Sequence, residues 1–396
     1  MASGPLAGYR IVDLTSFITG PLATMWLGDQ GADVIKVEQP GSGDVMRSTR
    51  PSREQLGAFY LTSNRNKRSI VVNLKQPAGS ALVQRLAETA DVFVQNFRPG
   101  VADRLGLGEH HLREKHPRLI YVSISGFGES GPLAGRRVYD TVVQAFSGMA
   151  VMQGTSTDAP HMVRTVIADK VTAQTVCQGI TAALLERERS GEGQHIHISM
   201  LHAMIAWLWP DGMSHFTFMD GDEGSGRGGI SQDQLMFHAV DGMLVVAAVT
   251  NAEWHAIARA IERPELGTDA RFATPRARAK NHEAMRTILA ERFQTATTAV
   301  WQRRLADEGA VFAPVNTPRQ VIHDEQVIGA DILFESEHPL AGPLRQPRHP
   351  VLFDRTPACD DARPAPALGE HTTEILRGLA MTGAEIERLR EQEIVQ

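Results

Sequence analysis

The sequence predicts an α/β protein with a mostly parallel sheet covered by helices on both faces, followed by a second, smaller α+β unit. Apolar, β-rich runs occur at residues 9–15, 33–38, 69–74, 91–95 and 119–125, and helix-length segments separate them. Strands that alternate with helices favour parallel pairing, because each parallel connection needs a crossover of about helix length. A chain of 396 residues is also longer than one compact domain usually is.

The clearest helix is predicted for residues 171–187. Ala173, Val176, Cys177, Ile180 and Leu184 fall at helical spacing and form one apolar stripe. The glycines at 191 and 193 end this helix, and residues 195–199 predict another strand.

The smaller unit is expected after residues 220–229, a polar, glycine-rich stretch typical of a linker or mobile loop. Strands are predicted at 243–249 and 311–315, and helices at 253–261, 276–293 and 298–308. Residues 338–366 are rich in proline and arginine and lack periodicity, so we expect them to wrap over a surface. A final helix is predicted at 382–392.

Composition excludes several classes of protein. The net charge is −6, and residues 1–140 carry only 17 Lys and Arg against 13 Asp and Glu, which is too weak for a nucleic-acid surface but attracts a small polyanion. Cysteine occurs only at Cys177 and Cys359, which predicts neither a disulfide framework nor a metal site and fits a cytoplasmic location. The N-terminus lacks a secretory pattern and no apolar run is long enough for a membrane span.

A dinucleotide site is a tempting interpretation of the first strand, helix and second strand, which ends in Glu38. Such a site needs closely spaced glycines after the first strand, where the backbone approaches a pyrophosphate. This chain has one glycine and a proline there, at residues 15–21. We therefore keep the sheet and do not assign Glu38 to a ribose.

Several stretches together point to one family. They are LGDQGADVIKVEQP at 27–40, NRNKRS at 64–69, NFRPG at 96–100, SISGFG at 123–128, GEGQHIHIS at 191–199 and PALGEHTTEIL at 366–376. In this order, over nearly the whole chain, they resemble the class III coenzyme A transferase family, which includes the related α-methylacyl-CoA racemases. The resemblance implies a Rossmann-like large domain built from both chain ends, here 1–220 and 331–396, a small domain at 221–330, and an interlocked homodimer.

Asp169 is the candidate catalytic residue. From sequence alone it lies just before the clearest helix, where an aspartate commonly caps the first turn. The resemblance matches it to the family's catalytic aspartate, which implies a carboxylate that forms an anhydride and then a thioester with CoA. The expected substrates are then an acyl-CoA and a carboxylic acid, whose identities the sequence leaves open, with no permanently bound cofactor and no metal.

The CoA-binding residues are expected at the ends of strands. Basic side chains there can pair with the phosphates of CoA, although an exposed arginine is often only a solvated charge. From charge and position, the candidates are Lys75, Arg98, Arg104 and Arg137. The resemblance adds Ser16, Phe17, Leu74, Asn96, Phe97 and Tyr139 to the CoA pocket.

Two further features leave alternatives open. Gly226, Gly228 and Gly229 match a glycine-rich flap of some relatives, but Arg227 interrupts the run and a linker has the same composition. Tyr139 precedes Asp140 where racemase relatives carry a histidine, so one proton-transfer group of a racemase is missing. A racemase and a non-catalytic CoA-binding protein remain the alternatives to a transferase. His195 and His197 are expected on the polar face of a strand.

Overall fold

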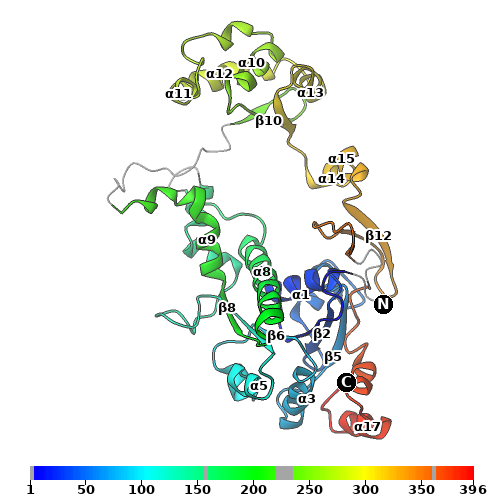
Figure 1. Ribbon diagram of the computed structural model, residues 1–396. Helices are drawn as coiled ribbons and strands as arrows, with labels where there is room; N and C mark the ends of the chain where they lie inside the picture. The colour runs from blue at the N-terminus through cyan, green and yellow to red at the C-terminus, as the bar shows by residue number, and fades with distance from the viewer. Residues whose placement is uncertain (1–3, 155–158, 220–234, 359–362) are drawn as a thin grey trace. The chain divides into compact units, whose positions relative to one another are not determined.

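The structure is a computed structural model that describes residues 4–154, 159–219, 235–358 and 363–396. The chain divides into two compact units, Met1–Gly226 with Ile332–Gln396, and Arg227–Asp331. The first unit contains the main sheet and the helices that cover it (Figure 1).

The main sheet has six strands, all parallel, in the order β5-β2-β1-β6-β7-β8. Strands β2 and β5 lie on one side of β1, and β6, β7 and β8 lie on its other side. The direction in which strands are added therefore reverses between β1 and β6. The predicted parallel sheet is confirmed. Its strands are β1 Arg10–Asp13, β2 Asp33–Glu38, β5 Lys67–Val71, β6 Val92–Gln95, β7 Ile120–Ser125 and β8 His195–Ser199.

Each face of the sheet is buried under helices. Successive side chains of β7 point to opposite faces, so Ile120 and Val122 pack in one apolar cluster and Tyr121 in the other. The long helix α8 (Ile167–Ser190) lies beside α1 (Thr19–Asp29) on one face (Figure 1). The other face is covered by α3 Pro77–Ala87, α5 Glu109–Lys115, α16 Thr372–Gly378 and α17 Gly383–Glu391.

Shorter elements complete the first unit. They are the helices α2 Ala58–Leu61, α4 Val101–Arg104, α6 Asp140–Phe146, α7 Met149–Gln153 and α9 Met200–Gly212, the 3₁₀ turns η1 Val45–Ser48 and η2 Ser214–Thr217, and the short strands β3 Ser52–Arg53 and β4 Leu56–Gly57. An antiparallel hairpin of β12 Leu333–His338 and β13 Gly342–Pro347 belongs to the same unit.

The second unit packs helices against a small antiparallel sheet of order β11-β10-β9. Its strands are β9 Met236–His238, β10 Met243–Ala247 and β11 Val311–Pro314. Its helices are α10 Asn251–Ala260, α11 Pro275–Lys280, α12 His282–Phe293, α13 Thr298–Asp307, α14 Pro318–Val321 and α15 Glu325–Gly329, with the turn η4 Pro264–Gly267.

One element prediction is wrong, and one hairpin was not predicted. The single helix expected at 276–293 is broken at Asn281, whose side-chain amide donates to the carbonyls of Arg271 and Ala277 and so favours a local turn. The segment 338–366, in which no strand was predicted, contains β13, which pairs with β12 after a turn at Gly342 with φ of 74°. The strand was not predicted because it has a proline near each end, and proline lacks the N–H that a central strand donates. A two-stranded hairpin tolerates proline because each strand has an unpaired edge.

A buried charge network joins the last residue of β1, Asp13, to Lys36 within β2 and to Lys67, the first residue of β5. The fully buried carboxylate of Asp13 accepts hydrogen bonds from the Thr15 amide and from the Lys67 ammonium, at 2.8 and 3.0 Å. Lys36 forms an ion pair with Asp44 at 2.9 Å and donates to the carbonyl of Thr15. The loop after β1 is therefore attached to three strands by charged groups that water does not reach.

The pKa values in this network reflect burial and pairing together. Burial favours a higher pKa for Asp13, but the ammonium groups of Lys67 and Lys36 outweigh it and lower the pKa. Burial lowers the pKa of Lys67 to about 8, against the opposing effect of Asp13. Each buried group thus keeps its ionised form in the folded state only because its oppositely charged partner is present.

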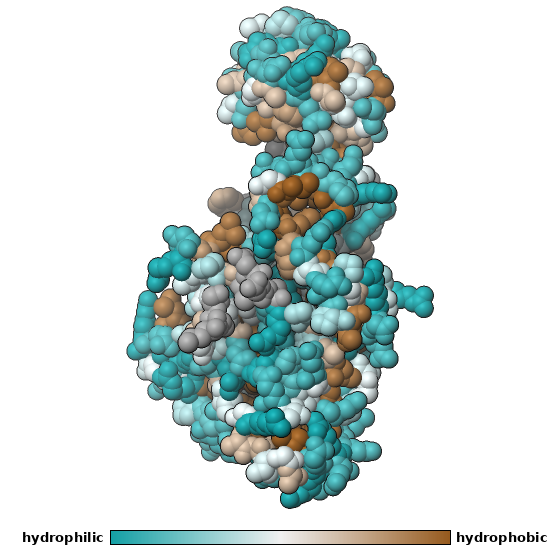
Figure 2. Space-filling model, turned by 90° about the vertical axis from the view of Figure 1, so that its right-hand side faces the viewer, coloured by the Kyte–Doolittle hydropathy of each residue, from teal (hydrophilic) through white to brown (hydrophobic). Residues whose placement is uncertain are grey.

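Within the described ranges, every helix is too short or too polar to cross a lipid bilayer. Figure 2 views the side on which β12 lies in Figure 1, and it shows a mainly hydrophilic surface with separate hydrophobic patches.

The substitution Lys67→Met is expected to destabilise the fold strongly. It leaves the buried carboxylate of Asp13 without its nearest cation, and loss of one partner from a buried pair costs about 3–5 kcal/mol. The free energy of unfolding, measured by denaturant titration, should fall by that amount. The matched variant Lys75→Met, at an exposed side chain, should change it little, and equal losses in both variants would contradict the role of the network.

Candidate functional site

The candidate site lies at the carboxyl edge of the main sheet, between the loops that follow β1 and β6. The Ser16 amide donates to the Asn96 side-chain oxygen at 3.1 Å, and the Asn96 amide group donates back to the Ser16 carbonyl at 2.9 Å. These loops follow the two strands between which the strand order reverses. Open parallel sheets bind ligands in the crevice at such a point.

Phe17 has a left-handed backbone conformation, which residues other than glycine rarely adopt. Its φ is 71°, and its amide donates to the buried carboxylate of Asp44 at 3.3 Å. Its ring lies 5.7 Å from the ring of Tyr139, and the two side chains are 39% and 60% exposed. A strained residue held by its surroundings is typical of functional sites. Here the strained backbone places the partly exposed ring of Phe17 beside that of Tyr139 at the edge of the sheet.

Asp169 is the third residue of α8 and does not cap it, so the prediction that it precedes the helix is wrong. The residue at the cap position is Val166, which makes no side-chain bond. A different carboxylate performs this role, because Asp140 accepts hydrogen bonds from the amides of Ala168 and Asp169 at 2.7 and 3.1 Å. The carboxylate of Asp169 is therefore not occupied by the helix's own backbone donors.

The environment of Asp169 raises its pKa to about 6, mainly because the carboxylate is partly buried. The Thr19 hydroxyl donates a hydrogen bond to its Oδ1 and opposes the increase, whereas the negative charge of Asp140 adds to it. At neutral pH roughly nine in ten such groups are ionised. The group is thus a carboxylate that water hydrates poorly.

Gln144 holds the segment that leads into α8. Its amide nitrogen donates to Asp140 and to the Thr165 carbonyl at 3.2 Å, and its side-chain oxygen accepts from the Val163 amide at 2.9 Å. Asp140 and Gln144 are four residues apart on α6, so they share one face of that helix. The sequence analysis assigned no role to Thr19 or Gln144. The number of residues between either of them and Asp169 does not indicate proximity, because the contacts arise from tertiary packing.

The predicted basic residues lie in the segments that follow β5, β6 and β7, with Arg104 at the end of α4. The side chains of Lys75, Arg98, Arg104 and Arg137 are exposed, and within the described ranges none of them makes a hydrogen bond or ion pair. Strands β5, β6 and β7 are parallel, so the loops after them emerge at one edge of the sheet. These side chains do not contact Asp169.

Leu74 and Phe97 are half-buried against the apolar cluster on the α3 face, which leaves part of each side chain at the surface. Gly226, Gly228 and Gly229, predicted as a flap, lie outside the described residues. Glu38 binds the guanidinium of Arg47 and the Ser69 hydroxyl, each at 2.7 Å, and is buried. Its carboxylate thus forms hydrogen bonds within the fold.

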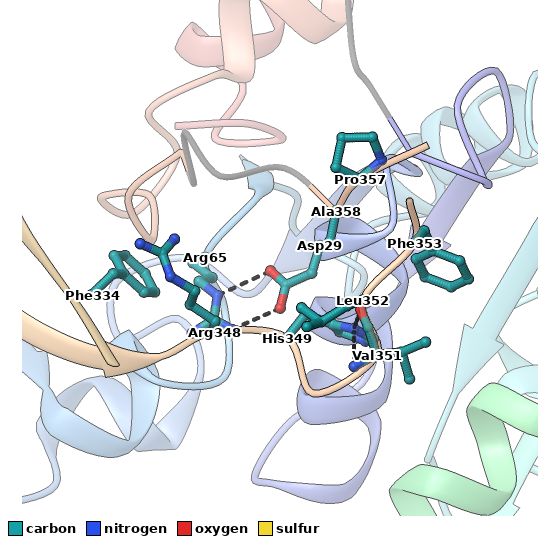
Figure 3. Close-up of a pocket in the computed structure, with 10 residues that line it drawn as sticks. All are labelled: Asp29, Arg65, Phe334, Arg348, His349, Val351, Leu352, Phe353, Pro357 and Ala358. Atoms are coloured by element: carbon teal, nitrogen blue, oxygen red, sulfur yellow. Dashed lines mark hydrogen bonds and ion pairs between the residues drawn. The ribbon is translucent and has the colours of Figure 1, made fainter. Parts of the chain in front are cut away.

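A separate cavity of about 130 Å³ lies at the opposite edge of the sheet, where α1 ends (Figure 3). Asp29, the last residue of α1, pairs there with Arg65 at 2.7 Å. The ring of Phe334 and the segment 348–358 complete the lining. None of the predicted site residues lines this cavity, and its acidic group is already neutralised.

The fold and site define an enzyme-like α/β protein with an aspartate and an anion-attracting surface at the carboxyl edge of a parallel sheet. The family model described as "CoA-transferase family III" matches residues 6–372, so the chain belongs to that family. It is 35% identical to human succinyl-CoA:glutarate CoA-transferase, over 94% of this chain and 85% of that protein. The predicted family and enzyme class, a CoA-transferase, are confirmed.

Two further relatives extend the similarity. The succinate–glutarate CoA-transferase of Agrobacterium fabrum is 34% identical over 95% of this chain and 96% of its own. The crystal structure of a CAIB/BAIF family protein from Brucella suis has a TM-score of 0.83 and 30% identity, and covers 95% of this chain and all of that one. The α/β architecture is thus that of the family.

Proposed function

We propose that this protein transfers coenzyme A from an acyl-CoA to a second carboxylic acid, with Asp169 as the covalent carrier. The observation that supports this most is the state of the Asp169 carboxylate. Asp140 satisfies the helix donors, so the carboxylate stays available at the edge of the sheet and is mostly ionised at neutral pH. Only an ionised carboxylate can attack a thioester.

The proposed reaction uses two anhydrides and one enzyme thioester. A carboxylate oxygen of Asp169 attacks the thioester carbon of the donor, the C–S bond breaks, and CoA leaves as a thiolate. The thiolate then attacks the Asp169 carbonyl carbon of the mixed anhydride, which releases the donor acid and leaves an aspartyl-CoA thioester. The acceptor carboxylate repeats both steps in reverse and restores the free carboxylate. No net proton is transferred, and water must be excluded from every acyl intermediate.

The CoA site is proposed on the same edge, in the domain formed by residues 1–220 and 331–396. The exposed cations Lys75, Arg98, Arg104 and Arg137 would bind phosphates, and arginine suits them because its guanidinium can donate two parallel hydrogen bonds. The aromatic pair Phe17 and Tyr139, with the backbone beside Ser16 and Asn96, would contact the pantetheine arm or the adenine. Leu74 and Phe97 would add apolar contact.

The acids are proposed to be short dicarboxylates. Relatives with 34–35% identity are named for succinate, glutarate and mesaconate, and one at 33% for oxalate. All of these acids carry a second carboxylate, which an acyl site can recognise by charge. A relative at 31% identity is named as a probable fatty acyl-CoA transferase, so a panel of acids must include long chains.

The active form is proposed to be a homodimer of interlocked subunits. Support comes from large hydrophobic side chains on α9 and η2 that the single chain leaves exposed, including Trp207 at 49% and Phe216 at 49%. Gly226, Gly228 and Gly229 are proposed as a flap over the reacting groups. The cytoplasmic location remains a prediction from the low cysteine content.

The substitution Asp169→Ala is expected to lower CoA exchange by at least about a thousandfold, because it removes the covalent carrier. The wild-type protein, incubated with succinyl-CoA, should show a CoA adduct on the peptide that contains Asp169 in mass spectrometry. The variant should lack the adduct but still bind CoA.

Asp211→Ala, at an exposed aspartate of α9, serves as the matched control and should exchange CoA normally. Undiminished exchange by Asp169→Ala would refute the proposal. Incorporation of deuterium at the α-carbon without an acceptor acid would instead indicate a racemase. CoA binding without exchange for any acid in the wild-type protein would indicate a non-catalytic role.

The rate of adduct formation should fall to half its maximum at a pH of about 6, where half of the Asp169 carboxylate groups are protonated. The substitution Asp140→Asn keeps an oxygen that can accept from the helix amides but removes a negative charge. The pKa of Asp169 should then fall, and the acidic limb of the rate profile should move to lower pH. Single-turnover rates at several pH values measure this, and an unchanged or higher midpoint would show that Asp140 does not act through its charge.

The substitutions Arg104→Ala and Arg137→Ala should each weaken CoA binding about tenfold, the loss typical of one charge-assisted hydrogen bond. Titration calorimetry measures the effect, which should shrink at higher salt concentration. Arg136→Ala provides a matched control, since Arg136 is an exposed neighbour that the proposal does not assign to CoA. Equal losses at 136 and 137 would indicate a general charge effect in place of a specific contact.

A further inference from the structure

Two histidines and a glutamate form a cluster on the edge strand of the main sheet. His195 and His197 are two residues apart on β8, so their side chains point to the same face. Glu129, from the loop after β7, lies beside them, with its Oε2 at 2.8 Å from Nδ1 of His197. One ligand atom from each of the three side chains lies within 4.8 Å of the other two.

This cluster is separate from the site around Asp169. The ring of His195 packs edge-on against Tyr121 at 5.0 Å, and Tyr121 belongs to the apolar cluster on the α3 and α5 face of the sheet. The neighbouring strand residues Ile196 and Ile198 belong to the opposite cluster, under α8. The two histidines therefore lie on the face of the sheet opposite to α8, the helix that carries Asp169.

The geometry suits a transition-metal ion. Zn²⁺ binds imidazole nitrogen and carboxylate oxygen at about 2.0–2.2 Å, so the ligand atoms of a tetrahedral site lie roughly 3.3 Å apart. The three ligand atoms, which lie within 4.8 Å of one another, must therefore move closer together when a metal binds. Glu129 and His197 can rotate, because their side chains are 45% and 53% exposed.

The neighbours of the cluster also suit a metal site. A ring nitrogen of His195 lies 2.8 Å from the Ser123 hydroxyl, which also accepts a hydrogen bond from Gln95 at 3.0 Å. Histidine ligands usually have one nitrogen held by such a partner, which orients the other toward the metal. Glu109 of α5 lies 4.0 Å from Nδ1 of His195 but is paired with Arg113, so a water is the expected fourth ligand.

We propose that Glu129, His195 and His197 form a binding site for one Zn²⁺ ion, which ties the loop after β7 to the edge strand β8. The histidines and the carboxylate match the preferred ligands of Zn²⁺, and three protein ligands leave one coordination position open. The site lies on the face of the sheet opposite to α8, so it is separate from Asp169 and does not rest on the function proposed for that residue.

The test is a Zn²⁺ titration of the full-length protein, without an affinity tag and after chelator treatment, in competition with a chromophoric chelator. The wild-type chain should bind one Zn²⁺ tightly, and Co²⁺ in its place should give the visible absorption of a tetrahedral site. Glu129→Gln and His197→Ala should each weaken binding by at least about tenfold, since even the loss of a partner that only orients a ligand costs that much.

The controls are Glu192→Gln and His323→Ala, which alter exposed residues outside the cluster and should bind Zn²⁺ like the wild-type chain. Zn²⁺ should also raise the melting temperature of the wild-type protein but not that of the cluster variants, whose metal-free melting temperatures should match the wild type. Equal Zn²⁺ binding by the wild-type chain and the Glu129→Gln/His197→Ala double variant, or no binding by the wild-type chain, would overturn the proposal.

Discussion

The buried pairing of Asp13 with Lys67, and of Lys36 with Asp44, is the constraint on which the carboxyl edge of the sheet depends. These charges come from β1, β2, β5 and the loop after β2, and they meet where the loop after β1 begins. Desolvated charges are tolerated only in good geometry with their partners. The loop that carries Ser16 and Phe17 is therefore held in one conformation, including the positive φ at Phe17.

The two neighbouring carboxylates Asp140 and Asp169 have different roles at the start of α8. Asp140 satisfies the amides of the first turn of α8, and its negative charge also raises the pKa of Asp169. Asp140 is thus occupied by hydrogen bonds from the helix backbone, and Asp169 is the carboxylate that we propose as the reacting group. A carboxylate with a pKa near 6 is still mostly ionised at neutral pH, yet it is less stabilised by water than an exposed aspartate and so is a better nucleophile.

Sequence reasoning was most successful where the signal is local. The strands of the main sheet and the apolar stripe of α8 follow from periodicity, because burial on one or both faces selects apolar residues at fixed spacing. It failed at Asn281 and at the β12–β13 hairpin, where a side-chain hydrogen bond and free strand edges overrode the pattern. Site residues matched to family motifs could be named, but Thr19 and Gln144 could not, since Thr19 meets Asp169 only in the tertiary structure and Gln144 binds the Val163 amide and the Thr165 carbonyl outside its own helix.

The sequence by itself determined the α/β class and the family and named Asp169 as the candidate carboxylate, because the alternation of strands with helices and the order of the motifs can be recognised along the chain. Only the tertiary structure decided which carboxylate caps α8, since Asp140 and Ala168 are 28 residues apart. It alone brought Glu129 to His195 and His197, because adjacent parallel strands place distant segments side by side. Spacing along the chain carries no information about such contacts, which depend on how strands pair and helices pack.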